Sequence, residues 1–240
     1  KVHQPRIAIA CKHMRYRVYT LESKLTKFSL HKKLQRSRLY LVTSPSEKLY
    51  EQVEAALQGG LTLVQYRDKE ADDYLRLETA YKLCQLCHHY KALFIVNDRV
   101  DVAVAVNADG VHLGQQDLPF AIARQLLGAQ RLIGRSTKNP DEMHRAIQEG
   151  ADYIGVGPVY ETPTKVGRAA VGLDYVRYAV DHATLPWFAI GGIDANNLAV
   201  VLKAGADRVA VVRAIMLAEQ PTKITQYLLN QFPGDMKSSI

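Results

Sequence analysis

The sequence predicts an α/β protein built as a (β/α)8 barrel, or TIM barrel, with a basic helical extension at its N-terminus. From residue 38 onward, short β-branched runs alternate with helical patterns of about a dozen residues, which is typical of repeated βα units. Eight such units in about 200 residues match the size of a barrel domain. Polar side chains follow the runs, where barrels carry their active sites. A doubly wound open sheet is the alternative arrangement of the same units.

The eight strands are predicted from apolar, β-branched runs that are shorter than core helices. They lie at residues 39–43, 61–66, 93–97, 110–113, 132–136, 153–157, 187–191 and 208–212. Glycine ends the preceding helices at Gly59, Gly150 and Gly205, and Asn139 and Asp194 mark the starts of two others. The sequence therefore predicts the order of the elements as well as their number.

Composition restricts the function classes. The chain has 240 residues with 48% hydrophobic content, enough for one main domain with a full core. No apolar run approaches the roughly 20 residues of a membrane span, so we expect no membrane partner. The formal charge is +7, but residues 1–37 carry +9 and the remainder −2, which argues against a nucleic-acid partner for the barrel. Three cysteines, an odd number, predict a reducing, cytoplasmic location.

Cys84, Cys87 and His88 match the attachment pattern of c-type haem. An amphipathic helix predicted over residues 72–90 contains all three, and cysteine is among the most readily buried residue types. We therefore interpret the two cysteines as core residues.

Residues 1–37 are predicted to form an extension that is separate from the barrel domain at 38–240. Seven apolar residues from Ile7 to Phe28 are spaced alternately by four and three, as in a coiled-coil seam. Such a seam needs a partner, which could be the barrel surface, a second copy of the chain, or a preceding domain that is missing from this sequence. A homo-oligomer and a fused N-terminal domain are both compatible with it. A marginal basic extension is the alternative, because three heptads are the lower limit for a coiled coil.

The second predicted strand ends in a row of polar side chains. Gln65, Arg67 and Lys69 alternate along the chain, so they emerge on one side of the strand end. Together they offer an amide and two positive charges, which suits an anion. A strand that merely reaches solvent could also end in such residues.

Two carboxylates follow the next two strands. Asn97 and Asp98 end the third strand, and Asp117 follows the fourth. Beside a cationic row, such a pair can hold one Mg2+ whose other positions go to phosphate oxygens and water. A salt bridge for Asp98 and a helix N-cap for Asp117 are the alternatives, and the joint position of the two favours the metal. His112 is interpreted as a structural strand residue without a clear partner.

The loop after the sixth strand is a candidate second anion clamp. Thr162, Thr164 and Lys165 place two hydroxyls and an ammonium group on a proline-stiffened loop, although a Pro-rich turn is the alternative. Glycines at 191–192 after strand seven, and residues 212–213 after strand eight, match the usual phosphate site of barrels. In that site backbone N–H groups and a helix N-terminus bind the phosphate.

Taken together and in this order, the motifs resemble those of the thiamine-phosphate synthase family. They are Gln-x-Arg-x-Lys at 65–69, Asn-Asp at 97–98, Ala-Asp-Gly-Val-His-Leu-Gly-Gln-Gln-Asp at 108–117, Ile-Gly-x-Ser at 133–136, Gly-Pro-x-Tyr-x-Thr-x-Thr-Lys at 157–165 and Ile-Gly-Gly-Ile at 190–193. The resemblance covers roughly residues 39–215. It implies a barrel transferase that joins an aminopyrimidine methyl pyrophosphate to a thiazole phosphate with Mg2+, giving thiamine monophosphate and pyrophosphate.

The resemblance also implies a role for each site residue. The catalytic residues would be Arg67, Lys69, Ser136 and Lys165. The pyrimidine pyrophosphate would be bound by Gln65, Arg67, Lys69, Asn97, Ser136 and Lys165. The thiazole phosphate would be bound by Thr162, Thr164, Gly192 and the backbone of Val212 and Arg213, and Mg2+ by Asp98 and Asp117.

Two positions depart from the family pattern. Lys138 stands where a histidine is common, and Arg213 stands where a serine is common. The second departure adds a cation beside the expected thiazole phosphate. Nothing in the resemblance covers residues 1–37.

Two other functions stay open on the sequence alone, namely a thiazole tautomerase of the related branch and a non-catalytic barrel that binds a phosphate ligand. A tautomerase needs no pyrophosphate pocket, so the row at 65–69 and the two carboxylates argue against it. Release of pyrophosphate distinguishes the three. The sequence identifies neither the thiazole tautomer nor the oligomeric state.

Overall fold

The computed structural model describes residues 27–161 and 169–233. In this part of the chain eight parallel strands close into a barrel in sequence order, which confirms the predicted fold class and excludes the open sheet. The strands are β1 (Leu39–Val42), β2 (Leu63–Tyr66), β3 (Leu93–Asn97), β4 (Gly110–Leu113), β5 (Leu132–Thr137), β6 (Tyr153–Val156), β7 (Trp187–Ile190) and β8 (Val209–Val211). Their ends differ from the predicted runs by no more than two residues.

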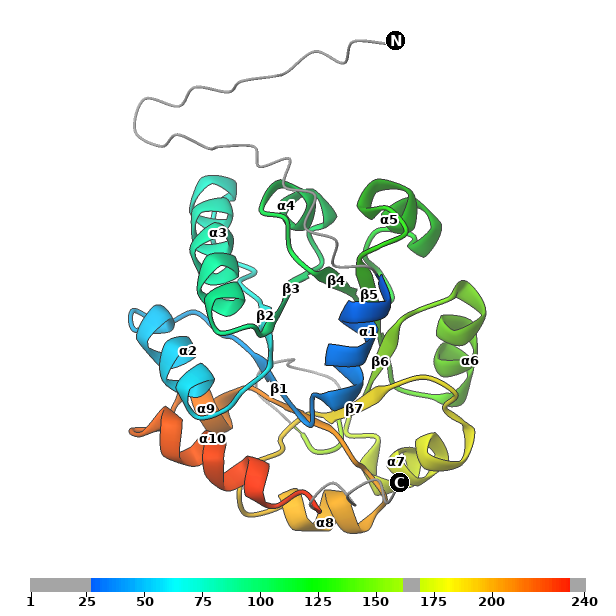
Figure 1. The fold of residues 1–240 in the computed structure, drawn as a ribbon. Coiled ribbons are helices and arrows are strands. Elements are labelled where there is room, and N and C mark those ends of the chain that lie inside the picture. Colours follow the sequence, from blue (N-terminus) through cyan, green and yellow to red (C-terminus); the bar gives the residue numbers. More distant parts are fainter. Residues whose placement is uncertain (1–26, 162–168, 234–240) are drawn as a thin grey trace, which may run out of the picture.

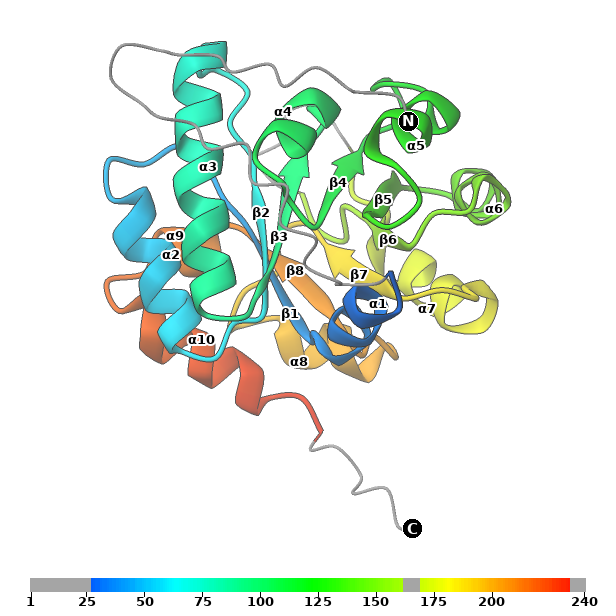
Figure 2. The ribbon, with the colours of Figure 1, turned by 45° about the horizontal axis from the view of Figure 1, so that its top comes forward.

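Helices surround the ring of strands, as Figures 1 and 2 show. They are α1 (Lys27–Arg36), α2 (Leu49–Gln58), α3 (Asp73–His89), α4 (Val100–Ala105), α5 (Phe120–Leu127), α6 (Pro140–Glu149), α7 (Gly172–His182), α8 (Leu198–Lys203), α9 (Arg213–Met216) and α10 (Pro221–Asn230). Asn139 caps α6 by accepting a hydrogen bond from the Glu142 N–H at 2.9 Å, and Gly150 ends it in the left-handed conformation. Both signals were expected from the sequence.

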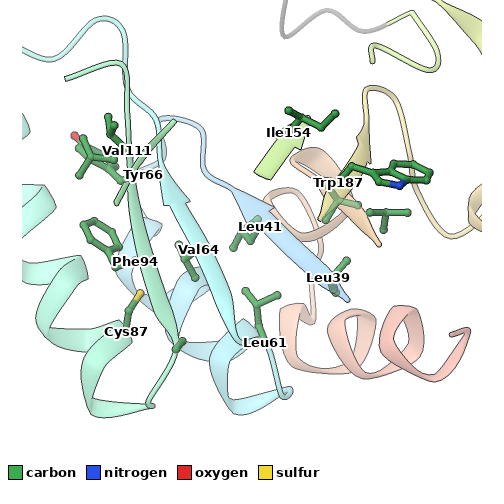
Figure 3. Packing of buried hydrophobic residues seen from close by; sticks show 14 of the residues in the cluster. Leu39, Leu41, Leu61, Val64, Tyr66, Cys87, Phe94, Val111, Ile154 and Trp187 are labelled. Carbon is green, nitrogen blue, oxygen red and sulfur yellow. The ribbon is translucent and has the colours of Figure 1, made fainter. Parts of the chain in front are cut away.

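The main core lies between the strands and the outer helices. Outward side chains of the strands, such as Val64 and Phe94, pack there against the helices. Figure 3 shows Cys87 of α3 close to Phe94 of β3. Cys84 and Cys87 are buried free thiols, which confirms their interpretation as core residues. Burial raises the pKa of both thiols, so they stay protonated and unreactive.

Helix α1 closes the N-terminal end of the barrel. In Figure 1 this helix, in blue, lies across the ring of strands. Leu30 and Leu34 lie four residues apart on one face of α1, and both belong to the apolar cluster inside the barrel. Leu63, Leu93 and Leu132 are members of the same cluster. The helix therefore fills the space that the short strands leave at this end.

A buried carboxylate ties α1 to the barrel. Asp152 is 3% exposed, and it receives Lys27 Nζ at 2.8 Å, His31 Nε2 at 2.8 Å and Arg124 Nη2 at 2.7 Å. The Ile133 N–H donates to the same carboxylate at 2.8 Å. Burial alone would raise the pKa of Asp152, but these donors hold it below its usual value. The polar contacts of Lys27 and His31 with Asp152 thus anchor the helix in addition to the apolar contacts of Leu30 and Leu34.

The face that α1 buries is not the seam expected from the sequence. Phe28, the last seam residue, is 66% exposed, whereas Leu30 and Leu34 are buried. The earlier seam residues lie outside the described residues. The division at residue 37 and the purpose of the extension stay predictions, but the described part of the extension belongs to the base of the barrel. Within residues 27–161 and 169–233, no helix is long and apolar enough to cross a membrane.

Candidate active site

A cavity of about 610 Å³ opens at the C-terminal ends of the strands. Seven of the predicted site residues line it, and they come from the ends of β2, β3, β5, β7 and β8. They are Gln65, Arg67, Asn97, Ser136, Gly192, Val212 and Arg213. Strand ends that are far apart in sequence meet here because a closed parallel barrel brings all its carboxyl ends to one rim.

Arg67 is held at the edge of this cavity by its backbone. Its N–H donates to Thr43 Oγ1 at 3.0 Å, which fixes the end of β2 against the end of β1. The side-chain Nε is buried and has no hydrogen-bond partner in the described part of the chain. A buried guanidinium N–H without an acceptor is costly, so this geometry suits an incoming anion.

Lys69, Asp98 and Asp117 form a cluster beside the cavity and do not line it. Lys69 Nζ lies 3.3 Å from Asp98 Oδ2, and the two carboxyl groups hydrogen-bond to each other. The Gly114 N–H donates to Asp117 Oδ2 at 2.6 Å. Asp117 therefore does not cap α5, which has Pro119 at its N-cap position. Asp98 does form a salt bridge, as the alternative expected, and its partner is Lys69. It also contacts Asp117, which the alternative did not include.

The two carboxyl groups of this cluster shift each other's pKa in opposite directions. Burial, followed by the contact with Asp117, raises the pKa of Asp98. Burial opposes ionisation of Asp117 too, but the hydrogen bonds from Asp98 and the Gly114 N–H outweigh it and lower its pKa. Two carboxylates at this separation need a proton or a cation between them. A cation bound between Asp98 and Asp117 would therefore stabilise both groups in the ionised form.

The donor set fits Mg2+. In the described ranges no group of three or more histidine, cysteine, aspartate or glutamate side chains could hold a metal. A Mg2+ at Asp98 and Asp117 would thus have two protein carboxylates and take its other ligands from phosphate oxygens and water. This is the usual arrangement for Mg2+ bound with a substrate phosphate.

His112 lies in β4 as predicted, but the expectation that it has no clear partner is wrong. His112 lines the cavity, and its Nε2 lies 2.9 Å from Ser136 Oγ. Its Nδ1 lies 3.2 Å from the Tyr153 hydroxyl. The neighbours come from β5 and β6, so nothing close to His112 in sequence indicates them. The sequence did offer one indication that His112 belongs to the site. It alternates with the outward Val111 and Leu113 on β4, so its side chain points into the barrel.

Other cavity residues were also missed or undervalued in the sequence. Tyr40 of β1 and Tyr153 of β6 form part of the floor of the cavity, and both point inward from strands that read as purely apolar. Lys138, one of the two departures from the family pattern, lines the cavity as well. Both departures therefore lie at the site.

The loops after β6 and β7 pack against each other. The N–H groups of Val159 and Tyr160 donate to the carbonyls of Ile190 and Gly191 at 2.8 and 3.0 Å. Gly192 has φ +66°, and a β-carbon there would lie 2.7 Å from Tyr160 Cβ. Only glycine suits this close approach and this backbone conformation. Thr162, Thr164 and Lys165 lie outside the described residues, so their predicted roles stay predictions.

The thiamine monophosphate synthase family matches residues 39–215, a range that contains all eight strands and every predicted site residue. This chain belongs to that family. The resemblance drawn from the motifs is therefore confirmed, together with the order in which they occur.

Relatives of known sequence and structure agree with this assignment. A thiamine-phosphate synthase of Nostoc sp. (strain PCC 7120) is 70% identical over 231 residues, which cover 96% of this chain and 66% of that protein. A second, from Synechocystis sp., is 62% identical over 96% of this chain and 67% of its own length. A thiamine phosphate pyrophosphorylase structure from Pyrococcus furiosus is 40% identical with a TM-score of 0.75, covering 84% of this chain and 96% of that one. The chain thus spans 66% of the length of its Nostoc relative.

Proposed function

We propose that this chain is the catalytic barrel of a thiamine-phosphate synthase, a transferase that makes thiamine monophosphate and releases pyrophosphate. The observation that carries the proposal is the buried, unpartnered Nε of Arg67 at a cavity of about 610 Å³, beside the Asp98–Asp117 pair. Membership of the family supports the same reaction. It is stated as a proposal for the barrel because this chain spans 66% of the length of the Nostoc relative.

The reaction replaces one bond with another. The C–O bond between the pyrimidine methylene and the pyrophosphate breaks, and its electron pair leaves with the pyrophosphate. The thiazole nitrogen supplies the pair for the new C–N bond, while the amino-substituted ring stabilises the positive charge on the methylene. The protein needs no nucleophile for this step. It has to hold the two substrates in line, exclude water and stabilise the charge on the leaving group.

The site residues would divide this work. Arg67, Lys69, Ser136 and Lys165 would stabilise the leaving pyrophosphate, and Gln65 and Asn97 would help to hold the pyrimidine substrate. The backbone at Gly192, Val212 and Arg213, with Thr162 and Thr164, would hold the thiazole phosphate. Asp98 and Asp117 would hold Mg2+, which when bound supplies positive charge to the pyrophosphate oxygens.

The remaining partner predictions are separate from this chemistry. The small-molecule partners of the barrel would be the pyrimidine pyrophosphate and the thiazole phosphate. Homo-oligomerisation, a fused domain through residues 1–37 and a cytoplasmic location stay predictions.

The direct test is a turnover assay with both substrates and Mg2+. The proposed activity releases pyrophosphate and forms thiamine monophosphate. A tautomerase would convert the thiazole phosphate without releasing pyrophosphate, and a non-catalytic barrel would only bind a phosphate ligand.

The carboxylate pair gives a sharper test. Asp98→Ala and Asp117→Ala should each lower kcat by about a hundredfold or more, because metal stabilisation of a leaving group is worth several kcal/mol. Asp101→Ala is the matched control, since the Asp101 side chain is 65% exposed and pairs with Arg99 at the surface. That variant should keep the parent rate. Near-normal, EDTA-sensitive activity in both Asp98→Ala and Asp117→Ala would contradict the metal assignment.

A further inference from the structure

Five side chains form a continuous hydrogen-bonded chain across the floor of the cavity. Gln65 Nε2 donates to the Tyr40 hydroxyl at 2.6 Å, and the Tyr40 and Tyr153 hydroxyls lie 2.9 Å apart. The Tyr153 hydroxyl lies 3.2 Å from His112 Nδ1, and His112 Nε2 lies 2.9 Å from Ser136 Oγ. The five residues come from β2, β1, β6, β4 and β5, so the chain runs from one side of the barrel to the other. We call it the floor chain.

The floor chain is shielded from solvent. Tyr40, Gln65 and Tyr153 are each no more than 3% exposed, and His112 is 7% exposed. Burial raises the pKa of both tyrosines above the ordinary value, so each hydroxyl keeps its single proton. The space for the central contact exists because residue 134 is glycine. A β-carbon at Gly134 would lie 2.6 Å from His112 Nδ1 and would also clash with the Tyr153 ring.

With one proton on the His112 imidazole, as on each tyrosine hydroxyl, the floor chain has two consistent directions. In the first, the Gln65 amide donates to Tyr40, Tyr40 to Tyr153, and Tyr153 to His112 Nδ1. His112 Nε2–H then donates to Ser136 Oγ, which leaves the Ser136 proton for a ligand. In the second, every donor is reversed, and Ser136 spends its proton on His112. In a mixed direction one hydroxyl would accept twice and its own buried proton would have no acceptor, which costs the desolvation of that group.

The direction decides what Gln65 presents to the cavity. In the first direction one amide N–H of Gln65 donates to Tyr40, and the amide oxygen is left as an acceptor. Among the described residues, no hydrogen bond occupies that oxygen. In the second direction Tyr40 donates to the amide oxygen, and the amide nitrogen is left as a donor. The state of Ser136 and the polarity of Gln65 are therefore linked across the barrel.

We propose that the floor chain makes recognition of an anion at Ser136 select a hydrogen-bond donor at Gln65. An anionic pyrophosphate oxygen accepts the Ser136 proton and favours the first direction, in which Gln65 can accept only from a donor such as the amino group of an aminopyrimidine. An oxo-pyrimidine would set its carbonyl oxygen against the Gln65 carbonyl oxygen and be rejected. Tyr40, Tyr153 and His112 act here as positioning residues. This inference rests on the proposed function and adds the basis of its substrate specificity.

The test compares two substrates that differ only in this group. The ratio of kcat/KM for the amino-pyrimidine pyrophosphate to that for the 4-oxo analogue is measured in the parent protein, Tyr40→Phe and Tyr153→Phe. Each variant interrupts the floor chain and frees the Gln65 amide to turn, so the ratio should fall by about tenfold, the value of one discriminating hydrogen bond. A loss of packing alone would lower both kcat/KM values together and leave the ratio unchanged.

Tyr175→Phe is the matched control. Its hydroxyl is also buried near the cavity, 2.8 Å from Thr137 Oγ1 and 2.9 Å from the Asn139 carbonyl oxygen, but it is outside the floor chain. This variant should keep the parent ratio. Thermal unfolding of all four proteins shows how much of any change in rate comes from stability.

A binding experiment tests the linkage without turnover. Inorganic pyrophosphate with Mg2+ should tighten binding of the aminopyrimidine alcohol in the parent protein, measured by calorimetry, and should do so less in Tyr153→Phe. A parent protein that turns over the amino substrate, with both variants keeping the parent selectivity, would overturn the floor-chain proposal alone. A parent protein that releases no pyrophosphate from the amino substrate would instead overturn the proposed function.

Discussion

At the base of the barrel the Asp152 carboxylate is surrounded by donors from Lys27, His31, Arg124 and the Ile133 N–H, whereas at the mouth Arg67 Nε is buried with no partner in the described residues. At both ends, polar atoms of a charged side chain are buried. Pairing within the chain turns the first into a structural anchor. The absence of a partner reserves the second for a ligand, because the cost of its burial is recovered only when an anion arrives.

The two ends of the barrel also differ in how their interior is filled. At the base, α1 inserts Leu30 and Leu34 among the inward residues of the strands and leaves the end closed. At the mouth, a cavity of about 610 Å³ remains. The comparison indicates that one end of the barrel is built for stability and the other for binding, so substitutions at the two ends should affect different measurements.

The largest expected effect is on stability, at the base. Asp152→Ala should lower the free energy of unfolding by about 3–5 kcal/mol, because it removes a buried carboxylate that accepts from three partly exposed side chains and from the buried Ile133 N–H. Urea unfolding measures it. Asp207→Ala is the control, since that carboxylate is 49% exposed and pairs with arginines at the surface, and it should cost at most about 1 kcal/mol. Similar losses in both variants would contradict the anchoring role.

Acid should reveal the same anchor. The folded-state pKa of Asp152 lies below the unfolded value, so its contribution to stability is present above about pH 4 and is lost as the pH falls through the folded pKa. The difference in unfolding free energy between the parent and Asp152→Ala should therefore narrow below about pH 4.

The next effect concerns the apolar part of the base. Leu34→Ala should destabilise the protein by about 2–5 kcal/mol, since Leu34 is completely buried beneath the barrel. Phe28→Ala, on the same helix but 66% exposed, should change stability by no more than about 0.5 kcal/mol. Thermal unfolding measures both losses. A larger loss in Phe28→Ala than in Leu34→Ala would indicate that α1 buries the predicted heptad seam instead.

At the mouth, substitutions should lower catalytic activity and leave stability largely unchanged. Arg67→Gln should lower kcat/KM by about a hundredfold, and Arg67→Lys, which keeps the charge but loses the planar fork, should still be clearly impaired. The free energy of unfolding should stay the same or rise, because the buried Nε has no partner to lose. Arg145→Gln on the exposed surface of α6 is the control. Full activity in both Arg67 variants would make Arg67 a plain strand-end residue.

The smallest effect is expected at the exposed rim of the mouth. Arg213 lines the cavity from the start of α9 but is exposed, so its charge is screened by solvent. Arg213→Ser should raise KM for the thiazole phosphate by roughly threefold and leave KM for the pyrimidine substrate unchanged. Steady-state kinetics with each substrate varied in turn distinguishes this from an equal effect on both.

The strand order and part of the site could be predicted because they depend on local patterns. Parallel strands buried on both faces leave short apolar runs, and glycines mark the ends of the helices between them. A closed barrel then brings every polar strand end to one rim. For this reason Gln65, Arg67, Asn97 and Ser136 could be predicted to lie in one site. That prediction depends on the order and direction of the strands and not on which side chains are in contact.

The tertiary structure alone decided which inward side chains meet. Tyr40 and Tyr153 are 113 residues apart, and His31 reaches Asp152 across 121 residues. The alternation of a strand places a side chain inside or outside, but its inward neighbours depend on how far each strand is staggered against the next around the ring. For that reason the sequence determined the barrel and the rim of its site. The floor chain, the partners of His112 and the anchoring of α1 required the closed structure.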